Sequence, residues 1–128
     1  MNKLTDATVF SKTYTIPFDK ELTKPAVEKL VRRLVLDVGS PLSHNGIIVG
    51  HIKVLAKLSA EEFIFVSLTR LDRVDVKFSA QWPVDAERGF TRFDLDVNVL
   101  VFGYEEAAIA KAVDAALAVL RQSNLYEE

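Results

Sequence analysis

Apolar and polar positions alternate with two different periods along the chain, and these periods predict its secondary structure. Residues 7–16 alternate in the manner of a half-buried strand, which we expect to end at Pro17. Residues 23–39 have apolar side chains at the spacing of an amphipathic helix, with Thr23 as the N-cap. The apolar stripe of this helix consists of Val27, Leu30, Val31, Leu34 and Val38.

The rest of the chain predicts strands followed by a second helix. The strands are expected at residues 47–58, 63–70, 73–82 and 89–103, and the helix at residues 104–122. The connections between the strands are short enough for hairpins. Two amphipathic helices can both be buried on the inward face of one sheet. We therefore predict a single α+β domain over residues 1–128: a two-layer sandwich of order β-α-β-β-β-β-α, with a mainly antiparallel sheet and both helices packed on one face.

The strand register follows from requiring that apolar side chains share a face. This rule pairs the strand at 73–82 with the next strand along the chain, with Ala80 opposite Phe93. It also pairs Thr69 with Val74, which turns Phe65 inward. A register shifted by one residue would do the opposite: it would bury Ile64, Val66 and Leu68 and expose Phe63 and Phe65.

In either register the strand at 63–70 has apolar side chains on both faces. Contiguous apolar patches on protein surfaces tend to mark interfaces. We therefore predict a partner surface, with self-association into a homodimer as its simplest form and another protein partner as the alternative. Alternatively, the long stems of Lys53, Lys57 and Lys77 shield these residues. The predicted patch consists of Ile47, Val49, Leu55, Ile64, Val66 and Leu68.

Both histidines lie near a predicted turn. Asn45-Gly46 is a strong turn dipeptide, so His44 belongs to a loop and the next residues begin a core strand. Gly50 inside that strand suggests a bulge or a close backbone approach. His51 is expected on the outward face opposite Arg70. The two could form a ligand contact, but we favour a surface or interface histidine.

Composition narrows the functional classes. The chain has 128 residues, with 16 basic residues against 18 acidic residues and no cysteine. A disulfide, a thiolate metal site and a cysteine nucleophile are therefore excluded. The balanced charge disfavours nucleic acid, because phosphate binding relies on a basic face. No apolar run is long enough to span a membrane, so we expect a soluble, cytoplasmic protein.

No residue pattern predicts a cofactor or a metal site. Asp94 and Asp96 point to the same side of their strand, but Arg92 and Lys77 are interleaved with them, and this mixture favours salt-bridged ladders. No phosphate-binding or dinucleotide fingerprint is present. The sequence therefore favours an accessory or interaction domain without catalysis of its own.

The alternative function is that of a small-molecule binding protein or an enzyme. In element order only, the chain resembles the helix-grip architecture of lipid-binding START-like domains. The resemblance implies a sheet curved around the C-terminal helix, with a cavity between them. In this chain the cavity would be lined by Trp82, Phe65, Phe78 and Tyr14.

Overall fold

The predicted order of elements and the α+β class are confirmed. A computed structural model describes residues 6–126, and a short 3-10 helix, η1, is added to the predicted elements. Along the chain these elements are β1 (Ala7–Leu22), α1 (Lys24–Gly39), η1 (Ser40–Leu42), β2 (Ile47–Lys57), β3 (Phe63–Arg70), β4 (Arg73–Phe78), β5 (Phe90–Phe102) and α2 (Glu106–Tyr126).

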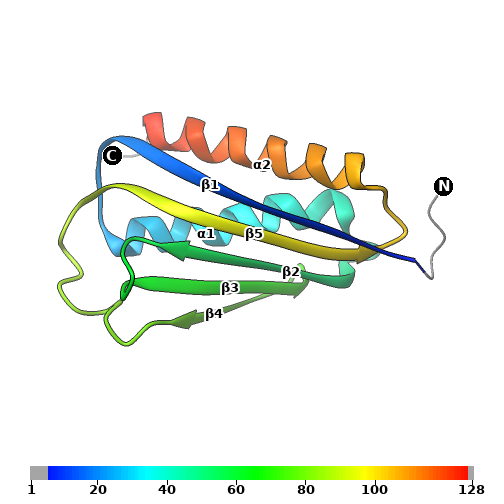
Figure 1. Cartoon of the computed structure of the whole chain (residues 1–128), viewed down its shortest axis with the longest axis horizontal. Coiled ribbons are helices and arrows are strands. Elements are labelled where there is room, and N and C mark those ends of the chain that lie inside the picture. Colours follow the sequence, from blue (N-terminus) through cyan, green and yellow to red (C-terminus); the bar gives the residue numbers. More distant parts are fainter. Residues whose placement is uncertain (1–5, 127–128) are drawn as a thin grey trace.

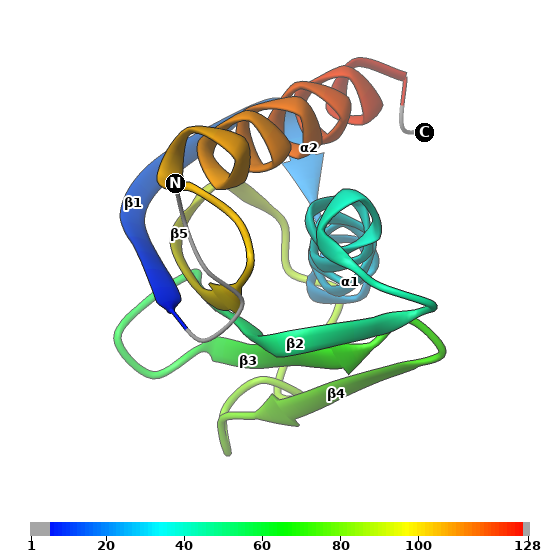
Figure 2. The ribbon, with the colours of Figure 1, turned by 90° about the vertical axis from the view of Figure 1, so that its right-hand side faces the viewer.

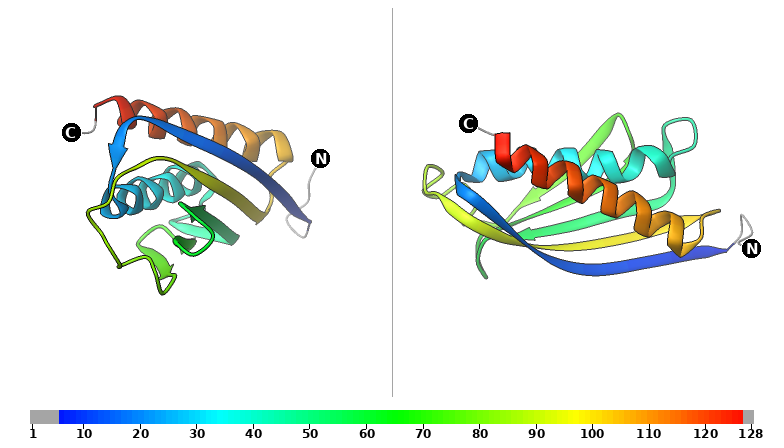
Figure 3. Two further views of the ribbon diagram at one scale, coloured as in Figure 1. Left: turned by 60° about the vertical axis from the view of Figure 1, so that its left-hand side comes forward. Right: turned by 90° about the horizontal axis from the view of Figure 1, so that it is seen from above.

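The strands form one antiparallel sheet in the order β1-β5-β2-β3-β4. Both helices pack on one face of this sheet (Figure 1). The sheet curves around them, and β4 lies at the margin farthest from α2 (Figure 2). Seen from above, α2 runs obliquely along the β1 side of the sheet (Figure 3). The helices therefore cover the sheet unevenly, and its β4 margin receives the least cover.

The core fills the space between the helices and the concave face of the sheet. Thr23 caps α1, since its side chain accepts a hydrogen bond from the backbone N–H of Ala26. Burial follows the predicted helical stripe of α1, and α2 contributes a matching stripe. Fully buried side chains from the two helices include Val27, Val31, Leu34, Val35, Ile109, Val113 and Leu117.

Two predicted strand boundaries were wrong. β1 continues past Pro17 to Leu22, with an irregularity in its pairing to β5 between these two residues. A proline is tolerated there because β1 is an edge strand and Pro17 needs no N–H for the ladder. β4 ends at Phe78, and Trp82 is buried in the following turn rather than in a strand.

The pairing of Ala80 with Phe93 was also wrong, because β5 pairs with β1 and β2 instead of β4. Residues 79–89 do not close a hairpin. They carry the chain from the β4 margin to the position between β1 and β2 (Figure 3). In this central position the 13-residue β5 forms backbone hydrogen bonds with long strands on both sides. Pairing with the 6-residue β4 would leave much of β5 without a partner strand.

The expected turn and the expected close approach in β2 are both confirmed. Asn45 and Gly46 have φ values of 55° and 79°, and His44 and Ile47 exchange backbone hydrogen bonds of 2.8 and 3.1 Å across them. This is the geometry of a two-residue hairpin turn with both central residues left-handed. Gly50 has a φ of 132°, and a Cβ there would collide with the carbonyl oxygen of Leu100. Only glycine fits this approach between β2 and β5.

Candidate interaction surface

Half of the predicted partner surface lies in the core. Ile64, Val66 and Leu68 have no solvent exposure. In the structure Val66 lies opposite Val54 on β2 and Val76 on β4, so both ladders are shifted by one residue from the favoured register. The alternative register is therefore the correct one. The physical reason is that α1 packs against β2 and β3, and these aliphatic side chains fill the space beneath it.

The remaining predicted residues all lie on β2 and differ in their exposure. Ile47 and Val49 are 44% and 51% exposed at the start of β2. Leu55 is half-buried on the outer face of the sheet, opposite Phe65, which is 39% exposed. Because of the shift in register, the outer face of β3 presents the exposed side chain of Phe65 instead of the predicted aliphatic row of Ile64, Val66 and Leu68.

Hydroxyl and carboxylate groups cover the other half of the outer face. Thr13 donates a hydrogen bond of 2.9 Å to Asp96, and Thr15 donates one of 3.1 Å to Asp94. β1 therefore supplies the partners of these carboxylates, whereas the sequence suggested basic residues. Among the described residues, no group of three histidine or acidic side chains is placed to hold a metal ion.

The β4 margin has apolar side chains that the helices leave uncovered. Val74, Val76 and Phe78 point to the same face as the core, since Val76 lies opposite buried Val66. Val74 and Val76 are nevertheless only half-buried, and Phe78 is 48% exposed. Within residues 6–126, β4 pairs with β3 alone. The margin thus combines an open strand edge with exposed apolar surface.

A groove continues this margin toward the start of α1. It has a volume of about 390 Å³, and apolar side chains make most of its wall. Phe78 forms the side nearest β4, and Trp82 and Pro83 belong to the 79–89 segment. Pro25 and Glu28 of α1 also line the groove.

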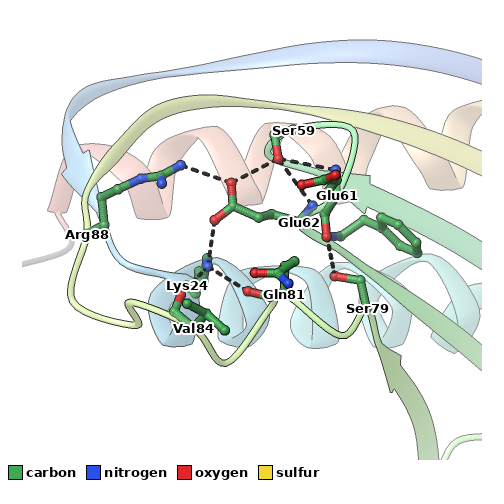
Figure 4. Close-up of polar contacts among 9 residues, drawn as sticks. Lys24, Ser59, Glu61, Glu62, Ser79, Gln81, Val84 and Arg88 are labelled. Carbon is green, nitrogen blue, oxygen red and sulfur yellow. Dashed lines mark hydrogen bonds and ion pairs between the residues drawn. The ribbon is translucent and has the colours of Figure 1, made fainter.

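A buried lysine fastens the 79–89 segment to the rest of the fold (Figure 4). Lys24 is 1% exposed, and its Nζ lies 2.7 Å from the carboxylate of Glu62. The same ammonium donates hydrogen bonds of 2.6 and 3.1 Å to the carbonyl oxygens of Val84 and Gln81. Its three donors thus have three acceptors, as a buried charge requires.

Glu62 completes this cluster from the turn between β2 and β3. The hydrogen bond from Lys24 is the main cause that holds the pKa of Glu62 below its usual value, against an opposing effect of burial. Ser59 and Arg88 also contact the carboxylate, both at 2.9 Å. The cluster is fully paired, so we interpret it as the structural support of the groove wall.

This cluster was not predicted from the sequence, although the sequence contains one signal for it. Lys24 lies in the first turn of α1, where no acidic residue accompanies it. A cation there is disfavoured by the helix dipole. An isolated lysine at a helix N-terminus therefore points to a carboxylate supplied by another part of the chain.

A second cavity, with a volume of about 510 Å³, lies where the start of β2 meets the end of β5. Leu42, Val49 and Phe102 provide apolar walls, and His44 and Tyr104 provide polar groups. This cavity differs from the one that the helix-grip resemblance implied.

The side chains expected to line the helix-grip cavity are not brought together. Phe65 lies on the outer face, whereas Phe78 and Trp82 share the groove beside β4. Tyr14 lies beneath α2, where burial, and secondarily the charge of Asp114, raise the pKa of its hydroxyl.

The predicted contact between His51 and Arg70 lacks the pairing on which it rested. Arg70 lies opposite Ile47 and makes two hydrogen bonds of 3.0 Å to Asp72. His51 lies opposite Leu100 on β5, within the stretch between Ile47 and Ile52 where the pairing of β2 with β3 is irregular. Its Nδ1 is buried without a hydrogen-bond partner among the described residues.

Comparisons with known proteins add little to this geometry. No known protein family and no curated protein matches the chain. Among solved structures, the Zn(II)-bound YjiA GTPase from E. coli is similar at a TM-score of 0.40 and 12% sequence identity, covering 88% of this chain and 30% of that one. In the described part of the chain, no helix is long and apolar enough to cross a membrane.

Proposed function

We propose that this chain is an accessory domain that works by association in the cytoplasm, without catalysis of its own, and that its partner is a second copy of itself. One observation carries the proposal: the row of Val74, Val76 and Phe78 at an open sheet edge, which the helices leave partly exposed. Folded proteins usually protect such edges, because the unpaired N–H and C=O groups are a template for another strand. An edge that also exposes apolar side chains gains from being covered.

The oligomeric state tests this proposal. We expect sedimentation equilibrium to show the mass of two chains at high protein concentration and dissociation on dilution, because a short edge strand makes a small interface. Phe78→Ser should shift the equilibrium toward one chain. Val9→Ser is the matched control, since Val9 is 61% exposed on β1, the other edge strand of the sheet. A wild-type protein that stays monomeric at all concentrations would refute self-association.

The 510 Å³ cavity supports a second candidate function, the binding of a small apolar molecule. Its volume lies within the range of about 300–1,000 Å³ typical of ligand pockets. We expect the fluorescent probe 1-anilinonaphthalene-8-sulfonate to bind the wild-type protein there. Val49→Trp should fill the cavity and reduce binding, whereas Val9→Trp should leave it unchanged. Equal binding by all three proteins would exclude this cavity as the site.

A further inference from the structure

The backbone of β4 has a definite direction in which it can accept another strand. The N–H of Ser79 donates a hydrogen bond of 2.9 Å to the carbonyl of Phe63, so Ser79 directs its backbone groups toward β3. Backbone groups alternate in direction along a strand. Lys77 and Asp75 therefore also face β3, and the even-numbered residues of β4 direct their N–H and C=O groups outward. A second strand must bond to Val74, Val76 and Phe78.

Charge excludes two of the symmetric registers in which two copies of β4 could pair. A two-fold pair centred on Asp75 places Asp75 opposite the partner's Asp75 and Arg73 opposite the partner's Lys77. A pair centred on Lys77 places Lys77 opposite the partner's Lys77. Like charges directly opposite each other destabilise a sheet.

The register centred on Val76 places no like charges opposite each other. Asp75 then lies opposite the partner's Lys77, which gives two attractive charge pairs on the outer face. On the inner face, Val74 lies opposite the partner's Phe78, and the two copies of Val76 meet at the axis. The outward backbone groups of these even-numbered residues face one another, as an antiparallel ladder requires.

Registers centred on Val74 and on Phe78 are the remaining alternatives, and both are poorer. A register centred on Phe78 overlaps the two copies of β4 only at Phe78 itself. In the register centred on Val74, only residues 73–75 of each strand would overlap, whereas residues 74–78 overlap in the register centred on Val76. The register centred on Val74 also sets Asp72 of the turn opposite apolar Val76. Its charge pair would join Asp75 to the partner's Arg73, which already has an ion pair of 3.2 Å with Asp75 of its own chain, whereas Lys77 has none among the described residues.

We propose that two copies of this chain join through antiparallel pairing of β4 with β4, with Val76 opposite the partner's Val76, so that the two sheets become one. This inference rests on the proposed self-association and specifies its geometry. The pairing satisfies the open backbone edge and gives Lys77 a carboxylate, where the described part of its own chain provides no ion pair. It also covers the exposed apolar row that the helices leave uncovered.

Single cysteines test the register directly, because the natural chain has none. In the proposed dimer the two Cα atoms at position 76 lie about 5.5 Å apart, within the range for a disulfide. Val76→Cys should therefore form a covalent dimer under mild oxidation. Val74→Cys is the matched control, since Val74 is also half-buried on the same face. Its two thiols would be separated by roughly four residues, or about 13 Å.

We expect Val76→Cys to cross-link on the order of tenfold faster than Val74→Cys, because paired thiols react at a high effective concentration. Faster cross-linking of Val74→Cys would overturn the register in favour of the one centred on Val74. If the wild-type protein is a dimer by sedimentation but the two variants cross-link equally slowly, β4 pairing is wrong while self-association stands. A monomeric wild-type protein refutes both.

Charge reversal provides an independent test with exposed residues. Lys77→Glu and Asp75→Lys should each weaken the dimer by about tenfold in Kd, because each places like charges opposite each other twice. The double variant Asp75→Lys/Lys77→Glu restores both pairs with reversed sign and should regain most of the affinity. Lys53→Glu makes the same change at an exposed position of β2, away from the β4 edge, and should have little effect. Failure of the double variant to recover would overturn the register centred on Val76.

Discussion

Replacing the buried lysine is the most informative perturbation of this fold. Lys24→Met keeps the long stem and removes only the ammonium. The change leaves the carbonyls of Gln81 and Val84 without their donor and separates Glu62 from its closest cation. We therefore expect the free energy of unfolding to fall and the 79–89 segment to loosen.

The size of the loss in unfolding free energy depends on which hydrogen-bond donors Glu62, Gln81 and Val84 keep when the ammonium is removed. Removing one member of a buried ion pair costs roughly 3–5 kcal/mol, since the other charge is left unpaired. Glu62, however, keeps Arg88 and Ser59 at 2.9 Å, and its side chain is 13% exposed. The main cost is thus the loss of donors to two carbonyls, each worth about 1.5–3 kcal/mol when the donor is charged. Methionine also avoids the desolvation cost of a buried ammonium, so we expect a loss of about 3 kcal/mol.

Urea unfolding measures the loss of stability, and the fluorescence of the single tryptophan reports on the loosening of the 79–89 segment. A loss of this size lowers the melting temperature by about 10 °C and leaves the domain folded, since domains are stable by about 5–15 kcal/mol. Trp82 is buried in the 79–89 segment, so its emission should shift to longer wavelength in the native variant. Lys29→Met on the exposed side of α1 is the control and should change stability by no more than about 0.5 kcal/mol. A loss below about 1 kcal/mol for Lys24→Met with unchanged emission would refute the reasoning.

Acid should weaken the same cluster, because the pKa of Glu62 in the folded protein lies below the ordinary value for glutamate of about 4.3. The stabilisation is therefore complete above the ordinary value and is lost as the pH falls through the folded pKa. Urea unfolding of Glu62→Gln should show less loss of stability over this acid range than the wild type. Val66→Lys should abolish folding by circular dichroism, because position 66 has no exposure and the charge would be buried unpaired; a folded variant would contradict the observed register. Phe78→Ala in the dissociated monomer should cost no more than about 1.5 kcal/mol, against about 2 kcal/mol or more for Leu95→Ala in the core, and the reverse order in thermal melts would contradict the exposed position of Phe78.

Local patterns decided which segments became helices and strands. The 3.6-residue stripe of α1 and the alternation in β5 each place their apolar side chains on one face, so sequence spacing alone identifies these elements. The Asn45-Gly46 turn was equally predictable, because few residues adopt two left-handed conformations in succession. The order of elements and the α+β class follow from these local signals.

Strand register and strand order were decided only by tertiary packing. β3 is apolar on both faces, so its sequence allows either face to point toward the core. The position of α1 above Ile64 and Val66 determines that their face is the buried one. The insertion of β5 between β1 and β2 depends on ladder length rather than on sequence proximity. The groove likewise exists because Lys24 meets Glu62 and the 79–89 segment across the fold. Contacts between residues far apart in the chain leave almost no periodic signal, which is why the sequence determined the elements and the tertiary structure determined the surface.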